Sequence, residues 1–152
     1  MDVGHLPLSS RAGSASLTRR VTFSAAHRYR RPEWDDATNE AAFGLCARAE
    51  YHGHTYTCDV TVDGPVDATT GMIVDLRLLD AALEREVLAR LNHRTLNTDV
   101  PEFADGALVP TGENLARLIA ERVQAALGAA ARVASVTVAE DATLSATWRV
   151  GG

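Results

Sequence analysis

The run from His52 to Val62 alternates between two kinds of side chain, and no other feature constrains the fold as tightly. Successive side chains of a β-strand point to opposite faces of the sheet. One face would therefore carry His52, His54, Tyr56, Cys58, Val60 and Val62. The other would carry Thr55, Thr57, Asp59 and Thr61. A strand with one apolar and one polar face is typical of an antiparallel sheet that is covered on one side.

The remaining periodic segments indicate the fold class. They are a strand over 17–27, helices over 75–91 and 111–128, and strands over 136–140 and 144–150. We expect residues 28–50 to form a long loop with at most a helical turn over 35–42, and inserts of this length are usually functional. The order ββααββ separates strands from helices, so it predicts an α+β fold with a four-stranded antiparallel sheet and both helices on one face.

Composition excludes several classes of function. The 152 residues carry 15 cationic and 20 acidic side chains, and every cation is an arginine. The absence of lysine excludes a Schiff-base lysine and a P-loop lysine. A net charge of −5 without a basic run argues against a nucleic-acid binder. No apolar stretch approaches the roughly 18 residues that cross a bilayer, so we expect no membrane partner.

The sequence predicts one domain over 17–152 behind a flexible extension. Residues 1–16 are rich in Ser, Gly and Ala and lack the basic and apolar parts of a secretory signal. Cys46 and Cys58 are too few for a disulfide framework and fit a reducing compartment. We therefore expect a cytoplasmic protein.

Three histidines form a candidate metal site. His52 and His54 would project from one face of their strand, and His27 ends the neighbouring strand on that strand's apolar face. Three imidazoles can hold a zinc ion and leave its fourth position open for chemistry. A histidine pair at the start of a strand can also be ordinary surface decoration. Spacing alone favours the metal site without settling it.

Several motifs at compatible spacings resemble the 6-pyruvoyl-tetrahydropterin synthase family, which includes the bacterial 6-carboxytetrahydropterin synthases of the queuosine and deazapurine route. They are FSAAHR at 23–28, FGLC at 43–46, HGHTY at 52–56, GMIVDL at 71–76, LNHR at 91–94, PEF at 101–103, PTGEN at 110–114 and Glu140. The resemblance covers roughly residues 18 to 150. It implies a tunnelling fold (T-fold) in which trimers of edge-joined sheets stack as a hexamer.

The resemblance also implies a metal and a substrate. It places Zn²⁺ on His27, His52 and His54, and it makes 7,8-dihydroneopterin triphosphate the small-molecule substrate. The family's general base falls on Cys46, which removes a C–H proton from the side chain of the substrate, although a free cysteine is more often buried and inert. Cys58 has a mid-strand position that indicates a core residue.

A proton relay with Cys46 is implied for His93 and the residue before it. The family has an Asp-His pair at this place, but Asn92 stands here instead. An amide can orient an imidazole but cannot stabilise its charged form as a carboxylate does. A histidine at the end of a helix can alternatively serve as a C-terminal cap.

The pterin ring would be bound by Glu140, whose carboxylate can accept from two N–H donors at once. The alternative for a carboxylate among apolar residues is an ion pair with an arginine. Thr111 and Glu113 would shape the same pocket, and Arg28 is the candidate for the triphosphate.

Our interpretation of the sequence is a zinc-dependent lyase that makes 6-carboxytetrahydropterin, chosen because that branch is the more widespread in small stand-alone domains. The first alternative is the 6-pyruvoyl product, formed with elimination of triphosphate. The others are a family member whose chemistry is altered by Asn92, or which only binds a pterin, and a non-catalytic zinc-stabilised oligomer.

Overall fold

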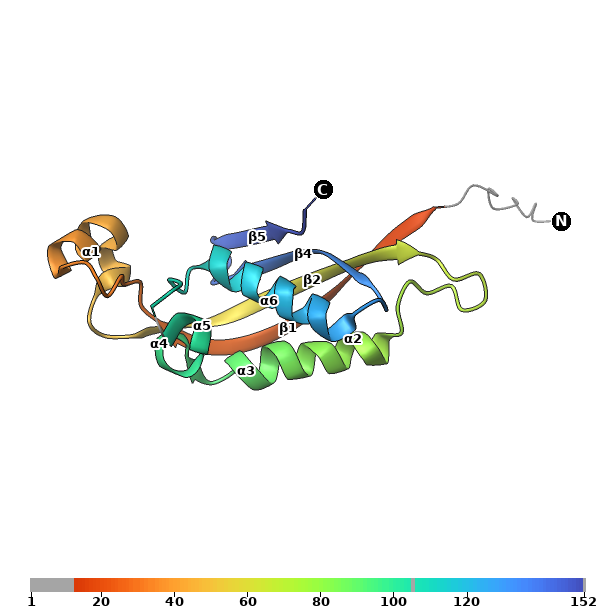
Figure 1. Cartoon of the computed structure of the whole chain (residues 1–152), viewed down its shortest axis with the longest axis horizontal. Helices are drawn as coiled ribbons and strands as arrows, with labels where there is room; N and C mark the ends of the chain where they lie inside the picture. The colour runs from red at the N-terminus through yellow and green to blue at the C-terminus, as the bar shows by residue number, and fades with distance from the viewer. Residues whose placement is uncertain (1–12, 105, 152) are drawn as a thin grey trace.

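A long antiparallel hairpin forms the centre of the computed structural model, which describes residues 13–104 and 106–151 (Figure 1). Strand β1 (Ser14–His27) pairs with β2 (His52–Pro65) along its whole length, from Ser14 opposite Pro65 to His27 opposite His52. Strand β4 (Arg132–Ala139) pairs antiparallel with β2, and β5 (Ser145–Arg149) with β4. The expected strands are thus present.

Two long helical segments cover one face of this sheet, as expected (Figure 1). The first consists of α2 (Leu76–Leu83), a π-helical turn (Glu84–Leu88) and α3 (Ala89–Leu91) in direct succession. The second is α6 (Gly112–Leu127). Between sheet and helices the core is fully buried, and its strand side includes the predicted Tyr56, Cys58, Val60 and Val62.

The sheet has five strands and is mixed, so the expected four-stranded antiparallel arrangement is wrong in this respect. Its order is β3-β1-β2-β4-β5, and β3 (Arg94–Thr95) runs parallel to β1. The backbone N–H of His93 donates to Ser24 O at 2.7 Å, which brings the polypeptide to the edge of β1. A strand of two residues has no alternation to detect, so its pairing depends on this tertiary contact alone.

Short helices occupy the segments that the sequence left irregular. The expected loop 28–50 contains α1 (Asp36–Phe43) and a 3-10 turn η1 (Gly44–Ala47). Helices α4 (Leu96–Asp99) and α5 (Pro101–Ala104) lie before α6. Most of the expected extension 1–16 lies outside the described residues, but Ser14 to Ser16 already belong to β1. No helix in the described part combines the length and apolar character of a membrane span.

Candidate active site

The three candidate metal ligands come together at the end of the β1–β2 hairpin. His27 and His52 are directly opposite each other across the two strands, and His54 follows on the same face of β2. Their ring nitrogens lie within 4.8 Å of one another, and the Nε2 atoms of His27 and His52 are 3.1 Å apart. The pairing register therefore converts residues distant in sequence into one cluster that could hold a metal ion.

The surroundings of His27 favour its neutral form with a free Nε2. Its ring is fully buried, and its Nδ1 lies 3.0 Å from Pro110 O and 3.0 Å from the Tyr56 hydroxyl. A carbonyl oxygen only accepts, so Nδ1 carries the hydrogen and Nε2 keeps its lone pair. Burial lowers the pKa of His27 to about 4. A neutral imidazole oriented through its other nitrogen is the usual form of a metal ligand.

His54 gives a direct test of whether a metal fits. Its Nε2 is buried and has no hydrogen-bond partner in the described structure. A buried polar atom without a partner costs free energy, so such an atom needs an explanation. Three converging imidazole nitrogens match the ligand preference of zinc. The donor set therefore fits a zinc ion bound by His27, His52 and His54.

A cavity of about 320 Å³ holds the predicted pterin-binding residues together. Thr111, Glu113 and Glu140 line it, along with Tyr29 and Phe43. The Glu140 side chain is 10% exposed and, among the described residues, makes no ion pair with arginine: its Oε1 accepts from the Tyr29 hydroxyl at 3.0 Å, and its Oε2 lies 3.6 Å from Nε2 of His54. The carboxylate therefore joins the cavity to the histidine cluster.

Helix α6 begins at this cavity because of two local features. The Thr111 hydroxyl caps the helix by accepting from the backbone N–H of Asn114 at 3.2 Å. A side chain at Gly112 would meet Cβ of Ala146 in β5 at 3.3 Å, so glycine allows the helix start to approach the strand closely. Glu113, in the first turn, is thereby placed at the cavity wall.

Cys46 lies in η1, half-buried, and its carbonyl accepts from the backbone N–H of Tyr29 at 2.8 Å. Burial, with the Glu140 charge, raises the pKa of its thiol. The protein itself therefore does not stabilise a thiolate, and a general base here needs a nearby cation. Cys58 is fully buried, its pKa is raised by burial to about 12, and it is a core residue as predicted.

Asn92 and His93 lie at the outer edge of β1. Asn92 Oδ1 accepts from the backbone N–H of Ser24 at 2.9 Å, so its amide anchors the strand. His93 is exposed, has a positive φ of 57°, and lines an open cavity that also includes His54. Cys46 lines a different cavity, next to His52. The two partners of the expected relay therefore line different cavities.

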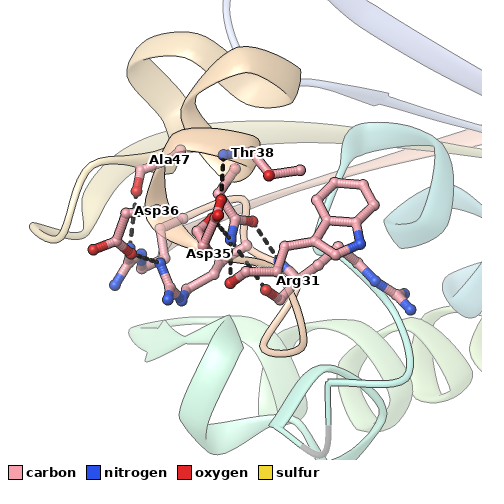
Figure 2. A network of polar contacts seen from close by, with 9 residues as sticks. Arg31, Asp35, Asp36, Thr38 and Ala47 are labelled. Carbon is pink, nitrogen blue, oxygen red and sulfur yellow. Dashed lines mark hydrogen bonds and ion pairs between the residues drawn. The ribbon is translucent and has the colours of Figure 1, made fainter.

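Arg28 lines a cavity of about 280 Å³ beside η1, together with Arg30 and Arg48. Its Nη2 donates to Ala47 O at 2.8 Å, whereas its Nε is buried without a partner among the described residues. Arg30 pairs with Asp36 at 2.7 Å. Figure 2 shows these contacts, from Asp36 at the start of α1 to Ala47 in η1.

Two tyrosines complete the site. Tyr56 follows His54 on the face of β2, where the alternation places it, whereas Tyr29, which extends the face of Ala25 and His27 beyond the end of β1, was not predicted. The same alternation could have selected Tyr29, but it could not have shown that the two hydroxyls reach Glu140 and His27.

Fold and site together define a class of protein: an α+β domain with a three-histidine cluster that could hold a metal, beside a cavity whose wall carries a carboxylate. The family model described as 6-pyruvoyl tetrahydropterin synthase matches residues 16–150. The chain is 44% identical over 110 residues to the 6-pyruvoyl tetrahydrobiopterin synthase of Drosophila melanogaster, a match that covers 72% of this chain and 64% of that protein's length. It is 40% identical over 113 residues to the human protein of the same name, covering 74% and 77%.

A solved structure agrees with this result. The Caenorhabditis elegans 6-pyruvoyl tetrahydropterin synthase matches with a TM-score of 0.86 and 32% identity, over 94% of this chain and 100% of that one. The chain therefore belongs to the 6-pyruvoyl tetrahydropterin synthase family. The expected membership is confirmed, and with it the expected enzyme class, because members of this family are lyases.

The expected 6-carboxytetrahydropterin product is wrong. The relatives named above are 6-pyruvoyl synthases, and their similarity extends over most of this protein. The carboxy product was favoured by how common each branch is among small domains, which says nothing about the residues of this particular site.

Proposed function

We propose that this protein converts 7,8-dihydroneopterin triphosphate to 6-pyruvoyl-tetrahydropterin with elimination of triphosphate. The observation that carries the proposal is the contact between the cavity and the histidine cluster: Oε2 of Glu140 lies 3.6 Å from Nε2 of His54. A ring bound by this carboxylate would have its side chain near the histidine cluster. Family membership supports the same reaction.

Residues of the cavity and of the histidine cluster would bind different parts of the substrate. Glu140 accepts from the 2-amino group and ring N–H of the pterin, while Thr111 and Glu113 shape the cavity around it. His27, His52 and His54 would hold zinc, which would act as a Lewis acid toward the side chain of the substrate.

Cys46 and His93 would transfer protons at the substrate's side chain. The thiolate of Cys46 takes a C–H proton, and His93 returns protons. Because Cys46 and His93 line different cavities of one protomer, their relay brings them together across a subunit interface. The unpartnered Nε of Arg28 supports this side chain as the triphosphate ligand, in a cavity with two further arginines. The two free thiols suit a reducing, cytoplasmic setting.

The test is incubation of the zinc-loaded protein with 7,8-dihydroneopterin triphosphate, followed by mass spectrometry of the pterin and assay of released triphosphate. We expect 6-pyruvoyl-tetrahydropterin and one triphosphate per turnover. A pterin released with its triphosphate intact, or no turnover with tight pterin binding, would contradict the proposal.

The oligomeric state is the first prediction. Strand β5 is an open sheet edge, and Leu144 just before it and Trp148 within it are 55% and 38% exposed. Unpaired edges of this kind need covering, and the relay needs a second protomer. We expect a trimer or a hexamer, with a mass three or six times 16.2 kDa by light scattering. A monomer at micromolar concentration would contradict this prediction.

The second prediction concerns Asn92. Because this residue replaces the aspartate of the family, the second candidate function is a family member with slow or altered chemistry. Asn92→Asp keeps the acceptor for the Ser24 N–H and adds an anion beside His93. A nearby carboxylate favours a protonated imidazole, so we expect kcat to rise several-fold. The carboxylate of Asp99, the other acid close in sequence, accepts from the Thr95 N–H at 2.8 Å and the Thr98 hydroxyl at 3.1 Å.

The matched control is Asn92→Ala, which removes the Ser24 contact and should lower the free energy of unfolding by about 1–3 kcal/mol. A wild-type rate that Asn92→Asp does not improve would show that the relay works without this carboxylate.

A further inference from the structure

Tyr29 contacts three separate parts of the candidate site. Its backbone N–H donates to the carbonyl of Cys46 at 2.8 Å, and its hydroxyl donates to Oε1 of Glu140 at 3.0 Å. Its ring meets the His27 ring edge-on, with centroids 5.0 Å apart. One residue therefore connects the thiol segment, the carboxylate and a metal ligand.

We propose that Tyr29 is a positioning residue of this enzyme, whose hydroxyl holds the Glu140 carboxylate in the orientation that binds the pterin ring. The inference rests on the proposed function, because it concerns how the proposed pterin ligand Glu140 is held.

The Glu140 carboxylate needs an external group to orient it. The terminal torsion of a glutamate side chain is broad, so the plane of the two oxygens is not set by the side chain itself. Here Oε1 receives the Tyr29 hydroxyl, while Oε2 lies toward His54. A carboxylate has about four lone-pair sites, so one bond from Tyr29 leaves acceptors free for two N–H donors of a flat ring.

Tyr29 is itself held on both sides. Its ring packs edge-on against His27, and against Phe43 of α1 with centroids 5.9 Å apart. The bond from its backbone to Cys46 fixes the backbone at the same point. The hydroxyl is therefore preorganised, and ligand binding does not have to order it.

Tyr29 also lines the same cavity as Glu140, so loss of its hydroxyl should change the affinity for a pterin ring bound there. Tyr29→Phe removes the hydroxyl and keeps the ring contacts. A hydrogen bond to a charged group is worth enough to change affinity about tenfold. The probe is 7,8-dihydroneopterin, which lacks the triphosphate and so reports on binding of the ring and its hydroxylated side chain without the contacts to phosphate.

We expect Tyr29→Phe to weaken 7,8-dihydroneopterin binding about tenfold and to raise KM for the triphosphate by a similar factor, with kcat within about threefold of wild type. Metal content should stay that of wild type, because the ring still packs on His27. The matched control is Tyr51→Phe, the same change at a 46% exposed tyrosine outside this cavity, which should leave binding unchanged.

A double-mutant cycle separates positioning from a general structural effect. In a Glu140→Ala background Tyr29→Phe should change affinity by less than about twofold, because the group it orients is gone. An equal loss in both backgrounds, or no loss in the wild-type background, would overturn the role of Tyr29 alone. Failure of the wild-type protein to bind 7,8-dihydroneopterin would instead overturn the pterin assignment on which the role rests.

Discussion

Replacing Cys46 with alanine should lower turnover of the pterin triphosphate by about a thousandfold or more, because it removes the proposed general base. Cys46 lies half-buried in η1, and the Tyr29 N–H holds its backbone in place. The substitution leaves that backbone bond intact. We therefore expect the variant to bind 7,8-dihydroneopterin and zinc as wild type does, and to fail only in the chemical step.

The protein offers a matched control in its other cysteine. Cys58 is fully buried in the core, so Cys58→Ala should lower the free energy of unfolding by about 1 kcal/mol and leave turnover per folded molecule unchanged. Steady-state kinetics of both variants, with melting temperatures alongside, decide the matter. Retention of most activity in Cys46→Ala would remove this thiol from the mechanism.

Replacing His52 with alanine should abolish metal binding. The wild-type protein, purified without added metal, should contain about one zinc per protomer by elemental analysis, and the variant close to none. Each of the three imidazoles contributes one ligand atom to a cluster within 4.8 Å, so the loss of one leaves too few protein ligands for a stable site. A ligand that binds only the folded state stabilises it, so a chelator should lower the melting temperature of wild type but not of His52→Ala.

His93→Ala is the control for this experiment. The residue is exposed and does not belong to the cluster, so its loss should leave zinc content unchanged. Stoichiometric zinc in His52→Ala, or equal loss in both variants, would contradict the assignment of the site.

Much of the fold and the histidine cluster could be predicted because their signals are local. Alternation between His52 and Val62 places two histidines on the buried face of β2, and the same rule places His27 at the end of β1. The helix start at Thr111 is likewise local, because the Thr111 side chain caps the helix. Such features depend on backbone geometry over a few residues, which any short window of sequence contains.

Other parts of the site had no local signal. The identity of Glu140 as a buried residue followed from its strand parity, but its partner did not: a tyrosine hydroxyl 111 positions earlier binds it where an arginine was the alternative. The sequence relates Asn92 only to its neighbour His93, whereas its side-chain oxygen accepts from the backbone N–H of Ser24, 68 positions earlier. Both contacts join residues that no periodic pattern relates.

The sequence by itself determined the long strands, the two long helices and which side chains share a face, because hydrophobic periodicity acts within a few residues. The tertiary structure alone decided the parallel β3 edge, the link from Tyr29 to Glu140, and the placing of Cys46 and His93 in different cavities. These depend on how the long β1–β2 pair, α1 and the end of α3 pack together. That packing is set by the sum of many distant contacts, each too weak to leave a pattern in the sequence.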